Sequence, residues 1–224
     1  MDILQRFTQR VCTDWLTTYC SDRKRNYDAA GFNKASIRVA EADAKDCMLA
    51  IDYGVVCDTH GGRYRANMST AQEVLFWEGH KTKSPRPITL WLEPVITFAA
   101  LARLHLVHGW PKEQLGMQPK GWAFDLAAHE ATGDSPPRIL GEVKKSGEEL
   151  RRLRADLLKL STGEPAETVS INSAKKWKAL LATKPAIVWL LAPNEESYVY
   201  APSYSSDGCE LREVEYSALA HSAA

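Results

Sequence analysis

Two acidic residues and one lysine stand at a spacing that could support phosphodiester chemistry. Asp125 lies in the segment 121–128, and Glu142 and Lys144 lie in the segment 138–145. Both segments alternate in the manner of β-strands, whose successive side chains point to opposite faces of a sheet. We therefore expect Asp125 to occupy one face of its strand between small neighbours, and Glu142 and Lys144 to share one face of the next strand.

A turn-forming run of Gly, Asp, Ser and Pro residues at 133–137 separates these two segments. The run predicts an antiparallel hairpin centred between residues 133 and 134. Because Asp125 and Glu142 are equally far from that centre, the hairpin sets them opposite each other. Two carboxylates about 5 Å apart repel, so one of them must bind a proton unless a cation lies between them.

A hard divalent cation is the natural solution to this repulsion. The carboxylates of Asp125 and Glu142, with the backbone carbonyl of Val143, are the oxygen ligands that Mg²⁺ or Mn²⁺ prefers. Such an ion lowers the pKa of a bound water and neutralises charge that builds up on a phosphodiester. Lys144 could then position the attacking water or stabilise the phosphate. The alternative is an ordinary hairpin whose carboxylates are solvated and whose lysine pairs with Glu142.

Helices and strands alternate around this hairpin in a defined order. Pro94 suits the first turn of a helix, which places Glu93 at the mouth of that helix. Apolar periodicity and breaker residues predict the remaining elements. The expected elements are a helix at 95–108, strands at 115–118, 121–128 and 138–145, helices at 148–160 and 172–182, and strands at 186–191 and 198–200.

This order, together with Asp125 and the run Glu142-Val143-Lys144, resembles the PD-(D/E)XK nucleases over residues 90–200. The resemblance implies an α/β fold with a restriction-endonuclease-like core, in which a mixed central sheet is flanked by helices. It also implies metal ligation by Asp125 and Glu142, with Lys144 as the catalytic lysine. The additional acidic residue that many members carry on the preceding helix would correspond to Glu93.

Two departures from the family pattern limit how finely it can be applied. Phe124 stands where the proline of the family name would be, a substitution common among members. The helix after Lys144 has no Gln or Tyr at the positions that some subfamilies use, so no subfamily is assigned.

The first 87 residues are expected to form an α/β extension that recognises a substrate or partner, with the nuclease-like core at 88–224. Apolar spacing predicts a helix at 3–19, and two segments at 36–39 and 47–57 favour strands. Thr70 and Glu73 fit a capping box that would begin a helix. The run 81–87, rich in proline, is typical of a linker.

The chain carries 28 Lys and Arg against 28 Asp and Glu, so its formal net charge is zero. No molecule-wide field attracts polyanions, and any contact with nucleic acid must be local. Cations on the two helices after the hairpin could follow a phosphate backbone, although their number and spacing favour a solvated helix face with acidic partners. These cations are Lys145, Arg151, Arg152, Lys175 and Lys176. Trp110 or Trp122 could stack on a base.

Composition and targeting signals indicate a cytoplasmic protein without a membrane partner. The longest apolar stretches, near 95–107 and 186–192, fall short of the roughly 20 residues that span a bilayer. The first residues lack the pattern of an export signal. The five cysteines are odd in number and show no metal-site spacing, which favours reduced thiols.

These features predict a Mg²⁺-dependent nuclease that hydrolyses phosphodiester bonds in nucleic acid, in DNA rather than RNA. The resemblance points to restriction, phage defence, repair or mobile-element processing. Because the chain is neutral, a homodimer or a partner subunit could supply further cations. The alternative is a module with a nuclease fold that binds nucleic acid or a protein without cutting.

Overall fold

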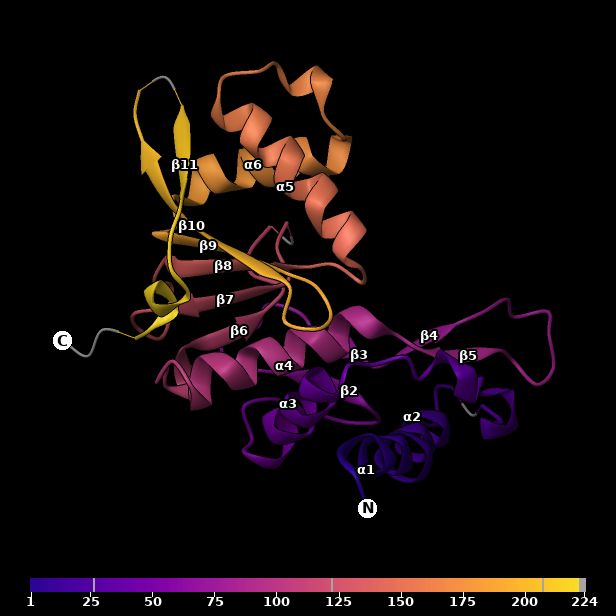
Figure 1. The fold of residues 1–224 in the computed structure, drawn as a ribbon. Coiled ribbons are helices and arrows are strands. Elements are labelled where there is room, and N and C mark those ends of the chain that lie inside the picture. Colours follow the sequence, from indigo (N-terminus) through magenta and orange to yellow (C-terminus); the bar gives the residue numbers. More distant parts are fainter. Residues whose placement is uncertain (26, 122, 207, 222–224) are drawn as a thin grey trace.

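A mixed sheet with helices on both faces forms the centre of the structure (Figure 1). The computed structural model describes residues 1–25, 27–121, 123–206 and 208–221, and within these the sheet has six strands. The strands are β6 (Leu115–Met117), β7 (Leu126–His129), β8 (Pro137–Val143), β9 (Ile187–Leu191), β10 (Ser197–Tyr204) and β11 (Cys209–Glu213). Their order is β11-β10-β9-β8-β7-β6, and only β8 and β9 pair in parallel.

The two faces of the sheet bury different sets of side chains. Ile139 and Val143 of β8 pack into the core that contains α4 (Leu92–Leu106), whereas Leu140 packs with the helices of the opposite face. Those helices are α5 (Gly147–Ser161) and α6 (Ile171–Thr183), which connect β8 to β9. Because side chains alternate along a strand, Glu142 lies on the face of Leu140, toward α5 and α6. Figure 1 shows α4 beneath the sheet and the other two helices above it.

Local sequence explains why α5 begins and packs where it does. The side chain of Ser146 accepts a hydrogen bond from the backbone N–H of Glu149 at 3.3 Å, which satisfies a free donor at the start of the helix. Acidic residues occupy the first turn, where the helix dipole favours them. Four leucines recur at helical spacing and are buried against the sheet: Leu150, Leu153, Leu157 and Leu160.

The N-terminal half adds helices and short strands beneath α4 (Figure 1). Its helices are α1 (Ile3–Gln9), a π-helical turn at Arg10–Trp15, α2 (Leu16–Ser21) and α3 (Glu41–Asp52). Its strands are β1 (Cys57–Asp58), β2 (Arg63–Arg65), β3 (Glu73–Val74), β4 (Phe76–Glu78) and β5 (Ile88–Leu90). The first three strands form one antiparallel sheet, and β4 pairs with β5.

The prediction of a strand at 47–57 is wrong, because most of that segment belongs to α3. The buried residues of α3 include Ala44, Cys47 and Met48; the last two follow the first by three and four residues, so all three share one helix face. Helix α3 packs against α4. Helix-favouring Ala, Leu and Met residues, with acidic residues in the first turn, outweigh the β-branched residues at its end. The strand expected at 36–39 is also absent, since those residues follow a short 3₁₀ turn at Lys34–Ser36 within the described part.

The capping box at Thr70 and the linker at 81–87 are wrong as well. Glu73 lies in β3 rather than in a helix. The segment after Glu78 is the loop of the β4–β5 hairpin, in which Glu78 pairs with Ile88. The expected boundary at residue 87 therefore falls inside a hairpin, and one hydrophobic core continues across it from Phe7 to Leu219.

The elements predicted between residues 93 and 200 are confirmed in type and order, although one strand is shorter than expected. The strand expected at 121–128 begins only at Leu126, and Phe124 packs on the opposite side of the sheet from Leu126. Beyond β11, the chain packs against the core, because Leu219 is fully buried and its carbonyl accepts the indole N–H of Trp110 at 2.7 Å.

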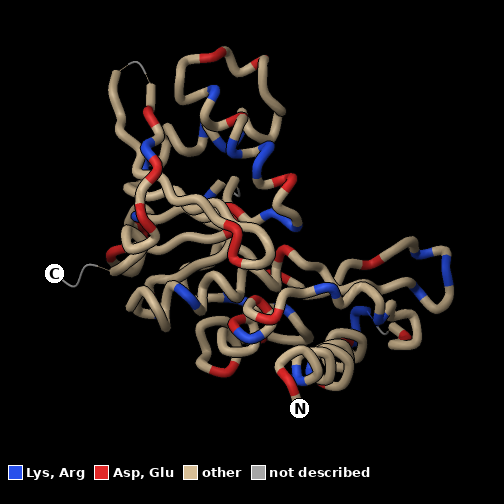
Figure 2. Tube along the Cα trace, viewed as in Figure 1, with Lys and Arg blue, Asp and Glu red and all other residues tan. Residues whose placement is uncertain are grey.

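Charges of both signs are interspersed along the chain, as expected for zero net charge (Figure 2). Of the helices in the described residues, none is long and apolar enough to cross a membrane.

Candidate active site

The hairpin of β7 and β8 brings Asp125 and Glu142 to the same position along the sheet. Leu126 pairs with Gly141, so the residues one step further along each strand are Asp125 and Glu142. The N–H of Asp125 donates to the carbonyl of Gly141 at 2.9 Å, which continues the ladder beyond the end of β7. Gly141 permits this close approach, because a Cβ there would lie 2.5 Å from Cδ1 of Leu126. The predicted register is confirmed.

Glu142 is almost completely buried, with 1% of its surface exposed, and it is paired with two ammonium groups. Its Oε1 accepts a hydrogen bond from Nζ of Lys144 at 2.5 Å, and its Oε2 accepts one from Nζ of Lys176 at 2.7 Å. A buried charge is stable only with such partners. The two lysines therefore compensate the buried carboxylate of Glu142.

Asp125 is the less well compensated of the two carboxylates. Burial, followed by the negative charge of Glu142, raises the pKa of Asp125 to about 8. The N–H of Val143, which donates to Oδ2 of Asp125 at 2.7 Å, and the charges of the two lysines oppose this shift. At neutral pH, Asp125 therefore holds a proton when no further cation is bound.

Replacing Asp125 with asparagine is expected to stabilise the metal-free protein as the pH rises. An unfolded aspartic acid has a pKa near 3.9, so between about pH 5 and pH 8 the folded wild type retains a proton that the unfolded chain has lost. Its unfolding free energy then falls by about 1.4 kcal/mol per pH unit relative to Asp125→Asn, and levels off above the folded pKa. Urea unfolding in EDTA at several pH values measures this difference; a difference independent of pH would contradict it.

Lys144 and Lys176 reach Glu142 from different elements. Lys144 follows β8, and its N–H donates to the carbonyl of Leu191 in β9 at 2.8 Å. Burial alone would lower the pKa of Lys144, but the charge and hydrogen bond of Glu142 outweigh it and raise the pKa. Lys176 descends from α6 and also donates to the carbonyl of Ala123 at 2.5 Å. Both lysines therefore face the same carboxylate.

The position of Lys176 corrects the expectation that it follows a phosphate backbone on an outer helix face. Sequence gave no signal for its contact with Glu142, because 34 residues separate the two and only the packing of α6 on the sheet joins them. The neighbouring cations behave as surface residues. Lys145 pairs with Glu149 at 3.2 Å. Arg152 pairs with Glu148, and Arg151 with Glu196 at 2.7 Å.

Lys175 is exposed and has no ion pair within the described residues. Trp110 cannot stack on a base, because it is fully buried. Trp122, the other tryptophan considered for stacking, lies outside the described residues.

Two further acidic residues lie near this group without joining it. Glu93, in the first turn of α4, accepts a hydrogen bond from the indole N–H of Trp91 at 3.1 Å, and its charge acts on Lys144. Burial and the charge of Glu93 raise the pKa of Glu73, which accepts a hydrogen bond from Gln118 at 2.5 Å. Because Glu73 was expected to cap a helix, its position in β3 near this group of residues was not predicted.

The carboxylates of Asp125 and Glu142 are the side chains expected to bind a divalent ion. Within the described residues no group of three or more His, Cys, Asp or Glu side chains is placed to share a metal ion, so Glu93 is not a third ligand in this arrangement. Asp125 and Glu142 nevertheless form a pair whose mutual repulsion raises the pKa of Asp125. Two carboxylates with one backbone carbonyl suit Mg²⁺, which takes its remaining ligands from water and phosphate. The residues therefore fit such an ion.

A pocket of about 540 Å³ opens beside the two lysines, between α5 and α6. Lys144, Lys176 and Arg152 line it, with Ser170 and Asn172 at the start of α6. Glu149 and Asp156 also line the pocket, so its charged lining is three cations against two carboxylates, a formal excess of 3 − 2 = +1. Asp125 and Glu142 do not line it.

Comparisons of the chain with protein-family models, with curated proteins and with solved structures found no match.

Proposed function

We propose that this protein is a metal-dependent nuclease that hydrolyses phosphodiester bonds in nucleic acid. The observation that carries the proposal is the convergence of Asp125, Glu142, Lys144 and Lys176 at the ends of β7 and β8. A repulsive carboxylate pair is costly in a buried place. Lys144 and Lys176, which line the adjacent pocket, are cations of the kind that binds phosphate oxygens.

Each residue has a distinct role in this proposal. Asp125, Glu142 and the carbonyl of Val143 hold Mg²⁺ or Mn²⁺, which when bound supplies an activated water and neutralises charge on the phosphate. Lys144 binds a non-bridging phosphate oxygen or orients the attacking water. Lys176 screens Glu142 and, when a cation takes over that task, is free to bind the adjacent phosphate.

The order of elements supports a place among the PD-(D/E)XK nucleases. Helix α4, the three antiparallel strands β6 to β8, then α5 and α6, and the parallel strand β9 reproduce the order expected of a restriction-endonuclease-like core. By that resemblance we propose DNA as the substrate, acting in restriction, phage defence, repair or mobile-element processing. A second copy or a partner subunit would add cations to a neutral chain. The free thiols agree with a cytoplasmic location.

One observation favours the alternative of a module that binds without cutting. Both oxygens of Glu142 already have lysine partners, and such an ion-paired group is self-sufficient without metal. In that case the pocket beside the lysines would hold a phosphate while Asp125 stays protonated.

A substrate panel distinguishes the two functions. The wild type is incubated with supercoiled plasmid, single-stranded DNA and RNA in Mg²⁺, Mn²⁺ or EDTA, beside Asp125→Asn. The nuclease proposal expects metal-dependent cutting, with DNA cut faster than RNA, and loss of cutting in the variant. Binding of nucleic acid by the wild type with no cutting in either metal would favour the alternative, and equal cutting by both proteins would indicate a contaminant.

A further inference from the structure

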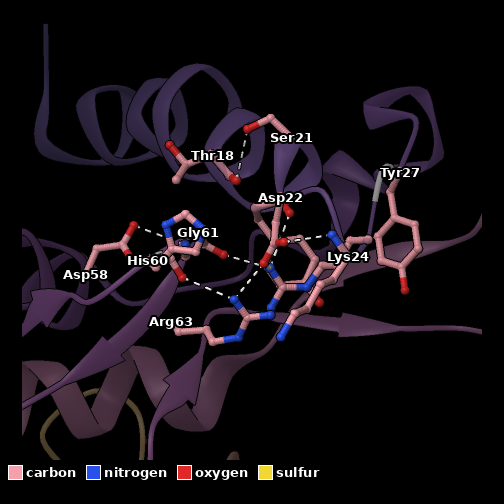
Figure 3. Close-up of polar contacts among 12 residues, drawn as sticks. Thr18, Ser21, Asp22, Lys24, Tyr27, Asp58, His60, Gly61 and Arg63 are labelled. Carbon is pink, nitrogen blue, oxygen red and sulfur yellow. Dashed lines mark hydrogen bonds and ion pairs between the residues drawn. The ribbon is translucent and has the colours of Figure 1, made fainter.

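A second pocket, of about 680 Å³, lies in the N-terminal half, between the end of α2 and the turn that precedes β2. The residues after α2 contribute Asp22, Arg23 and Lys24, and the turn contributes His60, with Arg63 from β2. Figure 3 shows Arg63 and Lys24 on either side of Asp22, with His60 and Gly61 beside them.

Asp22 is the buried anchor of this pocket. Only 3% of its side chain is exposed, and it accepts hydrogen bonds from the N–H of Lys24 at 2.9 Å and from Nη1 of Arg63 at 2.6 Å. These two bonds lower the pKa of Asp22 despite its burial. Asp22 is thus a fixed negative charge that holds Arg63 in place from inside the protein.

The turn before β2 lies close against the side chain of Asp22. Gly61 and Gly62 both have positive φ angles, of 61° and 71°, and a Cβ on Gly61 would lie 2.8 Å from Oδ2 of Asp22. Arg25 holds the turn in place. Its Nη1 donates to the carbonyl of Gly61 at 2.7 Å, and its Cζ lies 3.8 Å from the ring centre of Tyr19. The pocket is therefore rigid before any ligand arrives.

Positive charge remains in excess once these internal pairs are made. Three cations line the pocket, Arg23, Lys24 and Arg63, against the one carboxylate of Asp22, which leaves a formal charge of 3 − 1 = +2 with His60 neutral. Arg23 and Lys24 are exposed and have no ion pair in the described part of the chain. Arg63 uses only Nη1 in hydrogen bonds there and keeps 27% of its side chain exposed, so its other donors remain open to a ligand.

We propose that this pocket binds a backbone phosphate of nucleic acid and so anchors the substrate away from the cleavage site. The inference rests on the proposed function. A rigid arginine with open donors and two flexible cations is the combination that binds phosphodiester oxygens. Because the whole chain is neutral, a local excess of this kind is what a nucleic-acid contact requires.

The test compares binding of a labelled duplex oligonucleotide by fluorescence anisotropy, in EDTA to prevent cutting, over a range of salt concentrations. The variant is Arg23→Ala/Lys24→Ala, in which two exposed cations are lost and Asp22 keeps Arg63. The matched control is Lys45→Ala/Lys159→Ala, which removes two exposed cations from α3 and α5 that have no ion pair in the described chain. Both variants carry the same net charge.

We expect the pocket variant to bind about tenfold more weakly at 0.1 M salt, with a slope of log affinity against log salt that is shallower by about 1 to 2. The control should change binding by less than about twofold. Equal binding by the two variants would overturn the inference, as would a wild type that does not bind the duplex. Stabilisation of the wild type by inorganic phosphate, with duplex binding unchanged in the variant, would likewise overturn it and indicate a small-anion site.

This outcome is separate from that of the proposed function. At saturating DNA the pocket variant should still cut in Mg²⁺, because its catalytic residues are intact. If the wild type cuts DNA and the pocket variant binds the duplex as tightly as the wild type, only the phosphate-binding role of this pocket is contradicted. If duplex binding depends on Arg23 and Lys24 but no protein cuts, only the nuclease proposal is contradicted.

Discussion

Replacing Glu142 with glutamine is expected to reduce metal-dependent cleavage by about a thousandfold or more. The amide keeps the shape of the side chain but removes the charge that both Lys144 and Lys176 contact. A metal ligand supplies several kcal/mol of transition-state stabilisation, and each factor of ten in rate is about 1.4 kcal/mol. Initial rates on supercoiled plasmid over a range of Mg²⁺ concentrations measure the loss.

The matched control for that change is Glu130→Gln. Glu130 is also a carboxylate, in the loop between β7 and β8, but its ion pair with Arg138 at 2.5 Å lies at the surface. Surface pairs contribute about 0 to 1 kcal/mol, so the control should cut at close to the wild-type rate. Because Glu142→Gln leaves two half-buried lysines without a carboxylate, thermal unfolding checks that the variant is folded at the assay temperature. A folded Glu142→Gln protein that cuts normally would exclude this site.

The second large effect is expected from Lys176→Met, which should lower cleavage about a hundredfold while tightening the binding of Mg²⁺. Its ammonium now occupies Oε2 of Glu142 at 2.7 Å, so it competes with any other cation for that oxygen. Methionine retains much of the packing near Phe124, which Lys176 approaches to 5.6 Å from the ring centre. The loss of rate follows from the loss of a charged donor beside the phosphate.

The increase in melting temperature on adding Mg²⁺ reports the metal affinity in this experiment, and single-turnover rates report the chemistry. Lys175→Met is the control, since Lys175 is the exposed neighbour on the same helix. Slower cleavage with weaker metal binding would contradict the competition between Lys176 and the metal. Unchanged cleavage would remove Lys176 from the site.

The hairpin that carries the site could be predicted because its information is local. Alternation along residues 138–145 separates Glu142 from Ile139 and Val143, and the turn at 133–137 places β7 opposite β8. A register shift between Ala128 and His129, which the sequence does not reveal, lies between the turn and the pairing of Leu126 with Gly141. Apolar helices bounded by proline, serine and glycine can be predicted equally well from sequence. The predicted ends of α4, α5 and α6 therefore lie within a few residues of the observed ends.

The remaining features depend on contacts between distant parts of the chain. The run at 47–57 contains residues that favour a helix and residues that favour a strand, and the packing of α3 against α4 adds to the helical propensity of its first half. Asp125 stands one residue outside β7 yet continues its ladder through a single hydrogen bond to Gly141. Lys176 and Glu73 approach the site through the packing of α6 and through Gln118, and neither contact has a signature in the spacing of residues.

Calorimetric titration of Mn²⁺ into the metal-free protein tests most directly whether Asp125 and Glu142 together coordinate one divalent cation. We expect one ion per chain in the wild type and in Glu130→Gln, with affinity that rises with pH up to about 8 as Asp125 loses its proton. Binding should be lost in Asp125→Asn and in Glu142→Gln alike. Wild-type affinity in either of those two variants, or no Mn²⁺ binding by the wild type, would contradict the metal site on which the nuclease proposal stands.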